Sequence, residues 1–235
     1  MGKRPSETRA TQPPRRRLGV VVVDPLGVVR AGLGMLIANA DGTELLAEAG
    51  TADEALRAIA RARRSRVVVL VGLGLEEPHD ASWLIREIRE RYPTHAVLAV
   101  GANADPTSIS RALFVGADGF IDKRVEPEEF FESISRAGER EVVLAGPTSS
   151  SVGQIADGIH RRRELDAMLT PREREVLAIA AEGLTAREIA ARLGVRERTV
   201  TTHLGRIYGK LGVGNRLAAV RLAARSGLVT VGTPE

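Results

Sequence analysis

The sequence contains no cysteine, and Phe, Trp and Tyr together make up only 3% of its 235 residues. The absence of cysteine excludes disulfide bonds, thiolate catalysis and zinc sites built on cysteine, and it is consistent with a reducing cytoplasm. Because aromatic residues are scarce, the hydrophobic cores must consist mainly of Val, Leu, Ile and Ala. We therefore expect a cytoplasmic protein without structural cross-links.

Long apolar runs are also missing. The basic start of the chain is followed only by the short run Leu18–Val23, far below the roughly 18 residues that a membrane-spanning helix needs. This run is also too short for the apolar region of a signal peptide. We therefore expect no membrane partner.

Residue clusters that carry catalysis or bind metals are not evident. The four histidines, at positions 79, 95, 160 and 203, are scattered, and none has a second histidine or a carboxylate at ligand spacing. No Ser-His-Asp or paired-carboxylate spacing stands out. We expect no metal, no cofactor and no enzymatic activity.

The overall composition is that of a globular protein with a basic surface. Hydrophobic residues make up 43% of the chain and charged residues 27%, and the length corresponds to about one or two domains. The formal net charge of +4 favours a polyanionic partner, although weakly on its own. Residues 1–17 form a basic, proline-containing stretch for which we predict a disordered tail. Non-specific phosphate binding by this tail and a dispensable leader both remain open.

Residues 18–138 alternate short β-branched runs with amphipathic stretches. Continuous rather than alternating apolar strands indicate burial on both faces. The pattern predicts an α/β domain with a doubly wound, five-stranded parallel sheet. The expected strands are 19–24, 44–48, 66–71, 96–100 and 119–121, and the expected helices are 28–39, 52–63, 81–91, 106–115 and 127–136.

Residues 139–165 lose this rhythm, and we predict a linker. Val142–Ala145 is a candidate for a short extension, residues 146–151 are expected to be flexible, and Ile155–Ile159 favours the start of a helix. The basic run His160–Arg163 is compatible with a solvated linker or with a clamp on the DNA backbone.

Residues 166–235 predict an all-α domain of four helices. Thr170 and Glu173, and again Thr185 and Glu188, have the spacing of a capping box. The third helix, Glu197–Leu211, has an apolar face, and a fourth helix is expected from Asn215 to about Ser226. Two short capped helices before a longer basic one are typical of a helix-turn-helix.

The face of the third helix opposite its apolar stripe carries Arg198, Thr201, Thr202, Gly205 and Gly209, with Arg206 at its rim. Glycine in a helix interior costs roughly 1 kcal/mol relative to alanine, so two glycines on an exposed face favour close approach by a partner. A DNA major groove is such a partner. A solvated face on an ordinary bundle is the alternative.

The C-terminal part of the chain contains the motifs LTPREREVL, GLT-x-x-EIA-x-x-L, RTV-x-TH and KLGV. With these motifs it resembles the DNA-binding domain of the NarL/LuxR group of bacterial transcription factors. The resemblance implies a scaffolding helix at Arg187–Leu193, a recognition helix at Arg198–Lys210, and binding to double-stranded DNA at an inverted repeat. It also implies a homodimer through the fourth helix. The expected DNA-binding residues are Thr185, Arg187, Arg196, Arg198, Thr201, Thr202, His203, Arg206 and Lys210, and the expected dimerisation residues are Leu217, Val220 and Ala224.

Three residues depart from the pattern of that group. Thr201 replaces a common lysine, Gly205 replaces a common polar residue, and Arg196 occupies a position where a serine or threonine cap is usual. The base preference of the group is therefore not implied for this chain.

The N-terminal part of the chain contains the motifs VVVVDPLGVVRAGL, GADGFIDK and PEEFFESI. With these motifs it resembles the receiver domain of two-component response regulators. The resemblance places Asp24 at the first acidic position, Phe120 at the aromatic switch position and Lys123 at the lysine of that family. The second acidic position holds Pro25, and the end of the third strand, where the phosphoacceptor aspartate belongs, reads Val71–Gly74. The hydroxyl residue after the fourth strand is replaced by Val100 or Gly101.

Aspartyl phosphorylation needs a carboxylate nucleophile, several oxygen ligands for Mg²⁺ and a cation for the phosphoryl oxygens. With Asp24 alone these requirements are not met, and we predict that Asp24 pairs with Lys123. The sequence thus predicts a receiver fold controlled by a small ligand, a partner protein or abundance. A phosphorylation-gated regulator with a non-standard acceptor, among Asp24, Glu76, Glu77 and Asp80, is the alternative. A nucleotide-binding enzyme is disfavoured because no third glycine follows Gly72-x-Gly74.

Overall fold

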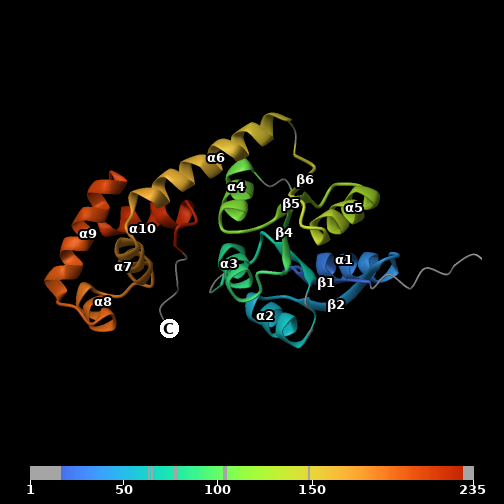
Figure 1. Ribbon diagram of the computed structural model, residues 1–235, viewed down its shortest axis with the longest axis horizontal. Helices are drawn as coiled ribbons and strands as arrows, with labels where there is room; N and C mark the ends of the chain where they lie inside the picture. The colour runs from blue at the N-terminus through green and yellow to red at the C-terminus, as the bar shows by residue number, and fades with distance from the viewer. Residues whose placement is uncertain are drawn as a thin grey trace, which may run out of the picture.

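The computed structural model describes residues 17–62, 64, 66–76, 79–102, 105–147 and 149–229. The predicted basic tail lies outside these residues except for Arg17. An α/β domain and a helical C-terminal domain are joined by one long helix (Figure 1). None of the described helices combines the length and the apolar character that a membrane crossing requires.

The sheet of the α/β domain has six parallel strands rather than the five predicted. Their order is β2-β1-β3-β4-β5-β6. The strands are β1 (Leu18–Val23), β2 (Thr43–Ala49), β3 (Val67–Gly72), β4 (Ala96–Gly101), β5 (Gly119–Asp122) and β6 (Val143–Ala145). The additional strand, β6, has only three residues, too few for a periodic signal, and pairs with β5 through Gly119 and Val143. The sheet therefore continues beyond the predicted domain boundary at residue 138.

Helices cover both faces of this sheet, which explains the continuous valine runs. They are α1 (Gly27–Asn39), α2 (Ala52–Arg61), α3 (Ala81–Arg91), α4 (Pro106–Phe114) and α5 (Pro127–Gly138). Along β1, Val21 and Val23 join the core under α2, α3 and α4, whereas Val20 and Val22 join the core under α1 and α5. Each valine of β1 is thus buried on one face of the sheet or the other.

Most of the predicted linker forms a single 20-residue helix, α6 (Ser149–Met168). Residues 149–151, expected to be flexible, form its first turn. The helix packs along α4 (Figure 1) and buries Ile155, Gly158 and Arg162. A Cβ atom at Gly158 would lie 2.5 Å from Ser110 Oγ of α4, so the two helices are in direct contact there. This packing, which no local pattern indicates, stabilises the helix.

The C-terminal domain contains the four predicted helices, α7 (Pro171–Ala181), α8 (Ala186–Leu193), α9 (Glu197–Leu211) and α10 (Arg216–Arg225). Both predicted capping boxes are confirmed, at Thr170 with Glu173 and at Thr185 with Glu188. Gly194 and Gly212 end α8 and α9 in the left-handed conformation, which glycine adopts without steric cost. The domain has its own core, centred on Val176, Leu177, Ile189, Val200, Ile207 and Ala219.

The end of α10 contacts the α/β domain. Arg86 of α3 donates a hydrogen bond to the carbonyl of Gly227, and the missing Cβ of Gly227 would lie 3.1 Å from side-chain atoms of Arg111 and Val115. Helix α9 lies on the far side of the C-terminal domain, away from the sheet (Figure 1). The domain contact therefore leaves the outer face of α9 uncovered.

A buried carboxylate ties α7 to the end of α9. Glu173 is 3% exposed, closes the capping box with Thr170, and accepts a hydrogen bond of 2.6 Å from Lys210 Nζ. Burial alone would raise the pKa of Glu173, but the hydrogen bonds from Lys210 and Thr170 outweigh burial and hold the pKa below its ordinary value of 4.5. The charged form of Glu173 therefore stabilises the folded domain.

This stabilisation has a defined pH range. Because the folded-state pKa of Glu173 is below its unfolded value, the contribution is fully present above about pH 4.5 and is lost as the pH falls through the folded-state pKa.

We expect Glu173→Gln to lower the unfolding free energy of the C-terminal domain by about 1–2 kcal/mol at pH 7 and to flatten its acid dependence. NMR-monitored urea titrations of α7–α9 at several pH values measure this. Glu175→Gln, at an exposed surface pair with Arg172, is the control and should leave both quantities unchanged. Equal acid dependence in the wild type and in Glu173→Gln would contradict the assignment.

Candidate nucleic-acid interface and receiver pocket

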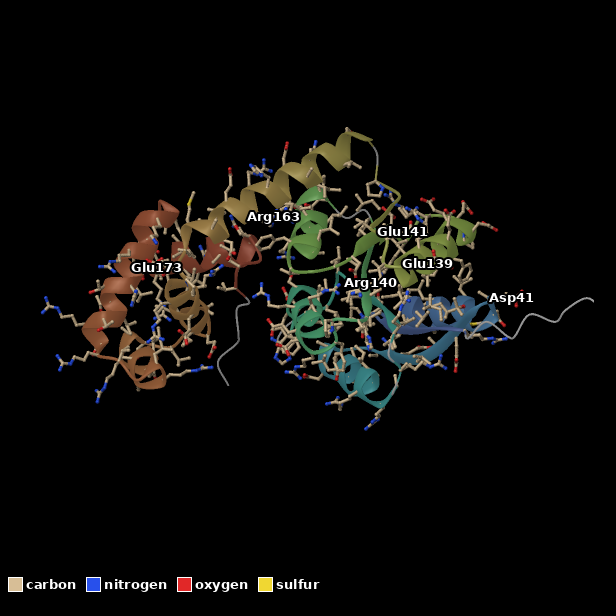
Figure 2. The ribbon with its side chains drawn as sticks, in the orientation of Figure 1. Asp41, Glu139, Arg140, Glu141, Arg163 and Glu173 are labelled. Carbon is tan, nitrogen blue, oxygen red and sulfur yellow. The ribbon has the colours of Figure 1, made fainter. Side chains whose placement is uncertain are left out.

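The outer face of α9 is polar, basic and exposed. Its buried side consists of Val200, Leu204, Ile207 and Leu211, which belong to the core of the domain. The exposed residues are Arg198, Thr201, Thr202, Gly205, Arg206 and Gly209. Side chains ending in nitrogen project outward from this side of the domain (Figure 2). The predicted recognition face is thus presented to solvent.

The two glycines on this face have no packing role within the chain. A Cβ atom built at Gly205 or Gly209 would meet no atom within 4 Å, leaving aside the backbone of the helix itself. By contrast, Gly158 in α6 is in contact with the neighbouring helix α4. Because glycine weakens a helix interior, glycine without an internal reason indicates an external one, such as a surface that approaches the backbone closely.

The N-terminus of α9 has no side-chain cap. Arg196 occupies the N-cap position, where the NarL/LuxR group usually has a serine or threonine. Because an arginine side chain has no acceptor atom, it forms no hydrogen bond with the N–H groups of the first turn. Thr201 and Thr202 donate their hydroxyl hydrogens to the carbonyls of Glu197 and Arg198. The N–H groups of an uncapped first turn are suited to a phosphate oxygen.

Other predicted DNA-binding residues have partners inside the domain. The Thr185 hydroxyl accepts from the Glu188 N–H and donates to Glu188 Oε2 at 2.7 Å. Lys210 is engaged in the ion pair with Glu173, so any contact of Lys210 with DNA would compete with that pair. His203 is half-buried, and its Nδ1 has no hydrogen-bond partner among the described residues. Arg187 is exposed on α8.

The predicted dimerisation residues differ in exposure. Leu217 is 59% exposed, whereas Val220 and Ala224 are half-buried and pack against the core of their own domain. Of these three residues, Leu217 offers the largest apolar surface to a partner.

In the α/β domain, the predicted ion pair is confirmed. Lys123 Nζ lies 2.5 Å from Asp24 Oδ2, and Asp24 is only 2% exposed. The other carboxylate oxygen, Oδ1, accepts a hydrogen bond of 2.9 Å from the backbone N–H of Leu26. Both oxygens of this carboxylate therefore have donors within the chain. Phe120, at the aromatic switch position, is 1% exposed and belongs to the core.

Gly72, the last residue of β3, lies directly beside this ion pair. A Cβ atom at position 72 would be 2.6 Å from Asp24 Oδ2 and 3.1 Å from the carbonyl oxygen of Val23. A side chain at position 72 would thus displace the Asp24 carboxylate from its present place.

Three other carboxylates follow β3 in the sequence. Asp80 caps α3 by accepting a hydrogen bond of 2.8 Å from the Trp83 N–H, Glu76 is exposed, and Glu77 lies outside the described residues.

Sequence reasoning missed the role of Arg162. This residue belongs to the basic run His160–Arg163, for which a solvated linker or a DNA clamp was expected, but its side chain is buried against α4. Arg161 and Arg163 are exposed, as expected of a linker. Only the helical spacing of Arg162 from the buried Ile155 and Gly158 could have indicated its burial.

Two family models match the chain. The response regulator receiver domain matches residues 20–135, and the luxR family of bacterial regulatory proteins matches residues 167–223. The chain is 30% identical over 212 residues to the transcriptional regulatory protein YdfI of Bacillus subtilis (strain 168), a match that covers 90% of this chain and 98% of that protein. It is 32% identical over 210 residues to the probable transcriptional regulatory protein SgaR of Hyphomicrobium methylovorum, covering 89% and 94%.

Among solved structures, the chain is similar to RcsB from Salmonella enterica serovar Typhimurium, with a TM-score of 0.53 and 20% sequence identity. That RcsB structure is bound to promoter P1flhDC in the presence of the phosphomimetic BeF3⁻. That match covers 89% of this chain and 99% of the other and shows a shared fold. The two family matches and the nearly full-length relatives agree on one architecture. The chain belongs to the transcriptional response regulators of the luxR family, in which a receiver domain is joined to a helix-turn-helix DNA-binding domain.

Proposed function

We propose that this chain regulates transcription by binding specific DNA sequences through the outer face of α9, independently of phosphorylation of its receiver domain. In this proposal it acts in the cytoplasm as a homodimer on an inverted repeat, with Leu217 at the centre of the dimer contact. A two-fold dimer would place two recognition helices about one DNA turn apart.

Three features of α9 support the DNA interface. Arg198 and Arg206 are exposed and can reach base edges or phosphates, the uncapped first turn offers N–H groups to a phosphate, and Gly205 and Gly209 permit close approach. The same face is exposed with both domains present, in the part of the chain that the structure describes. No rearrangement of the receiver domain is therefore needed to uncover it.

The arrangement of Gly72, Asp24 and Lys123 carries the proposal of phosphorylation independence. The residue at the end of β3 has no nucleophilic side chain, and each oxygen of the Asp24 carboxylate already accepts a hydrogen bond, from Lys123 and from the Leu26 N–H. Pro25 supplies no oxygen ligand from its side chain. Control would then come from a small ligand or a protein partner at the receiver domain, or from abundance. A phosphorylation-gated regulator remains the alternative, because the exposed Glu76 follows β3 closely.

The assignment of the recognition face predicts the effect of two substitutions. We expect Arg198→Ala and Arg206→Ala each to weaken binding to the specific site by roughly 1–3 kcal/mol if they contact bases, and to relax sequence preference. Fluorescence anisotropy with specific and scrambled duplexes measures both effects. Arg57→Ala, at an exposed arginine of α2, is the matched control. Unchanged affinity and preference in both α9 variants would rule out this face.

The glycines give a test in which stability and binding change in opposite directions. Gly205→Ala and Gly209→Ala should each stabilise the C-terminal domain by about 0.5–1 kcal/mol, because alanine is the better helix former and no atom obstructs its methyl group. The same variants should bind DNA more weakly if a DNA surface approaches the helix backbone. Thermal unfolding and anisotropy titrations of the same preparations measure the two quantities. A rise in stability with undiminished DNA affinity would place the DNA elsewhere.

A further inference from the structure

Arg162 is a buried cation. Its residue is 7% exposed, and its hydrogen bonds to the described residues include no carboxylate. Its four hydrogen-bond acceptors are all uncharged: Ser110 Oγ at 2.8 Å and the carbonyl oxygens of Gly158, Thr107 and Arg225 at 3.0, 3.1 and 3.5 Å. Buried charges in proteins are ordinarily paired, because desolvation of an isolated charge is costly. Within the described residues, the guanidinium thus has no hydrogen-bonded carboxylate, and only Asp105, without a hydrogen bond to it, favours its charge.

The guanidinium also has an unused donor. Its Nε–H is buried and has no hydrogen-bond partner in the part of the chain that the structure describes. Buried polar atoms are usually satisfied by the protein, water or a ligand. Nε and a terminal nitrogen form the edge of a guanidinium that binds carboxylates and phosphates in a bidentate manner. The free donor is thus of the type that an oxyanion would use.

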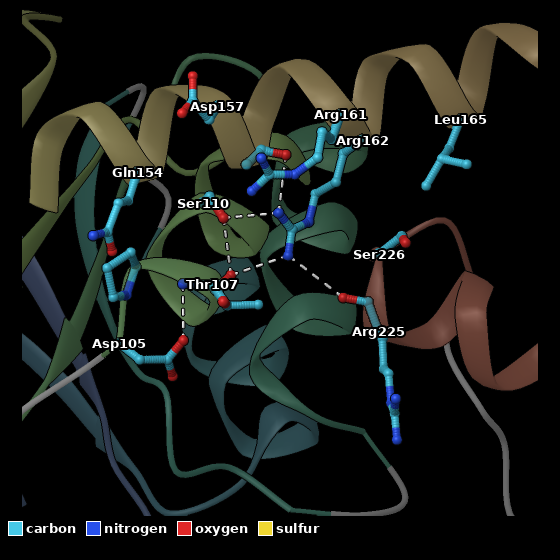
Figure 3. A pocket seen from close by; sticks show the side chains of 12 residues that line it. Asp105, Thr107, Ser110, Gln154, Asp157, Arg161, Arg162, Leu165, Arg225 and Ser226 are labelled. Carbon is cyan, nitrogen blue, oxygen red and sulfur yellow. Dashed lines mark hydrogen bonds between the residues drawn. The ribbon is translucent and has the colours of Figure 1, made fainter.

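Arg162 lines a cavity of about 570 Å³ between the two domains (Figure 3). This volume is within the range of small-molecule sites. The cavity is bounded by α4, by α6 and by the end of α10, where Arg225 and Ser226 lie. Residues of the receiver domain, the connecting helix and the C-terminal domain therefore all line this cavity.

Positive charge predominates around the cavity. Arg161 lines it together with Arg162, and Arg111 is close enough to repel the Arg162 charge. Arg225 also lines the cavity, but its carbonyl oxygen faces Arg162 while its side chain points away (Figure 3). Desolvation, and then repulsion by Arg111 and Arg161, lower the pKa of Arg162 from its ordinary value. Two carboxylates also line the cavity. Asp105 is engaged as the N-cap of α4 with Thr107 and Ser108, and Asp157 is exposed on α6.

We infer that this cavity binds a small organic or inorganic oxyanion, a carboxylate or a phosphate, and that Arg162 is its central ligand. An anion there would supply a carboxylate or phosphate counterion to the Arg162 guanidinium, with Arg161 as a second cation lining the cavity. Bound in this place, it would strengthen the contact among α4, α6 and the end of α10. Its use as a control signal rests on the proposed phosphorylation-independent function, whereas the binding itself does not.

Calorimetric titration of the full chain tests the site, with inorganic phosphate and succinate as probes and sodium chloride holding the ionic strength constant. We expect saturable binding of at least one probe, and Arg162→Gln should weaken it at least about tenfold because a charge-assisted hydrogen bond is lost. Arg163→Gln is the matched control, since Arg163 is exposed on the same helix (Figure 2) and should be dispensable. Absence of saturable binding for both probes, or equal affinity in Arg162→Gln, would overturn the inference.

A second variant separates anion binding from the packing of α6. Ser110→Ala removes a neutral acceptor of Arg162 but keeps the guanidinium charge, so anion affinity should persist. Loss of binding in Ser110→Ala to the same degree as in Arg162→Gln would show that helix packing, not the charge, determines the result, and would overturn the inference. The calorimetric titrations contain no DNA, so absence of anion binding would not contradict the DNA-binding proposal. Conversely, unchanged DNA binding by the α9 variants would not contradict the anion site.

Discussion

The direct contact of α6 with α4 fixes the position of everything that follows it in the chain. Gly158 allows the two helices to touch at Ser110, and Arg162 then bonds across the junction to α4 and to the end of α10. Arg86 adds a second bond between the domains at Gly227. Since α9 belongs to the same helical domain as α10, these contacts also place α9 on the side of that domain away from the receiver sheet (Figure 1).

In the receiver domain, a buried ion pair lies at the carboxyl ends of the central strands. Among the described residues, the Asp24 carboxylate there is paired with Lys123. Such a pair has no excess negative charge with which to hold Mg²⁺. Gly72 is compatible with this arrangement because it leaves room for the Asp24 carboxylate. The surrounding core, built from both faces of the sheet, does not depend on the chemistry of the pocket.

Much of the architecture could be predicted because it depends on local patterns. Runs of valine indicated β1 and β3, and the spacing of Thr170 with Glu173 and of Thr185 with Glu188 located the starts of α7 and α8. The pairing of Asp24 with Lys123, 99 residues apart, was predicted only through the resemblance to receiver domains.

The features that sequence reasoning missed depend on distant contacts. The sequence indicated a short extension at Val142–Ala145 but not its place in the sheet, because β6 forms there by pairing with the edge of β5. The helical state of residues 149–154 and the burial of Arg162 depend on α4, and the ion pair of Lys210 with Glu173 joins residues 37 positions apart. Periodicity reports which face of a helix is apolar, but not which other element will cover a glycine or an arginine.

The most direct test of phosphorylation-independent regulation is a titration of the full chain against a genomic DNA site selected by the protein itself. The titration is made with and without acetyl phosphate and Mg²⁺, and affinity is read by fluorescence anisotropy. With Gly72 at the end of β3 and Asp24 paired with Lys123, we predict selective binding of the same affinity in both conditions. Binding that requires the phosphodonor would contradict the account, and would show that another side chain of the receiver domain accepts the phosphoryl group.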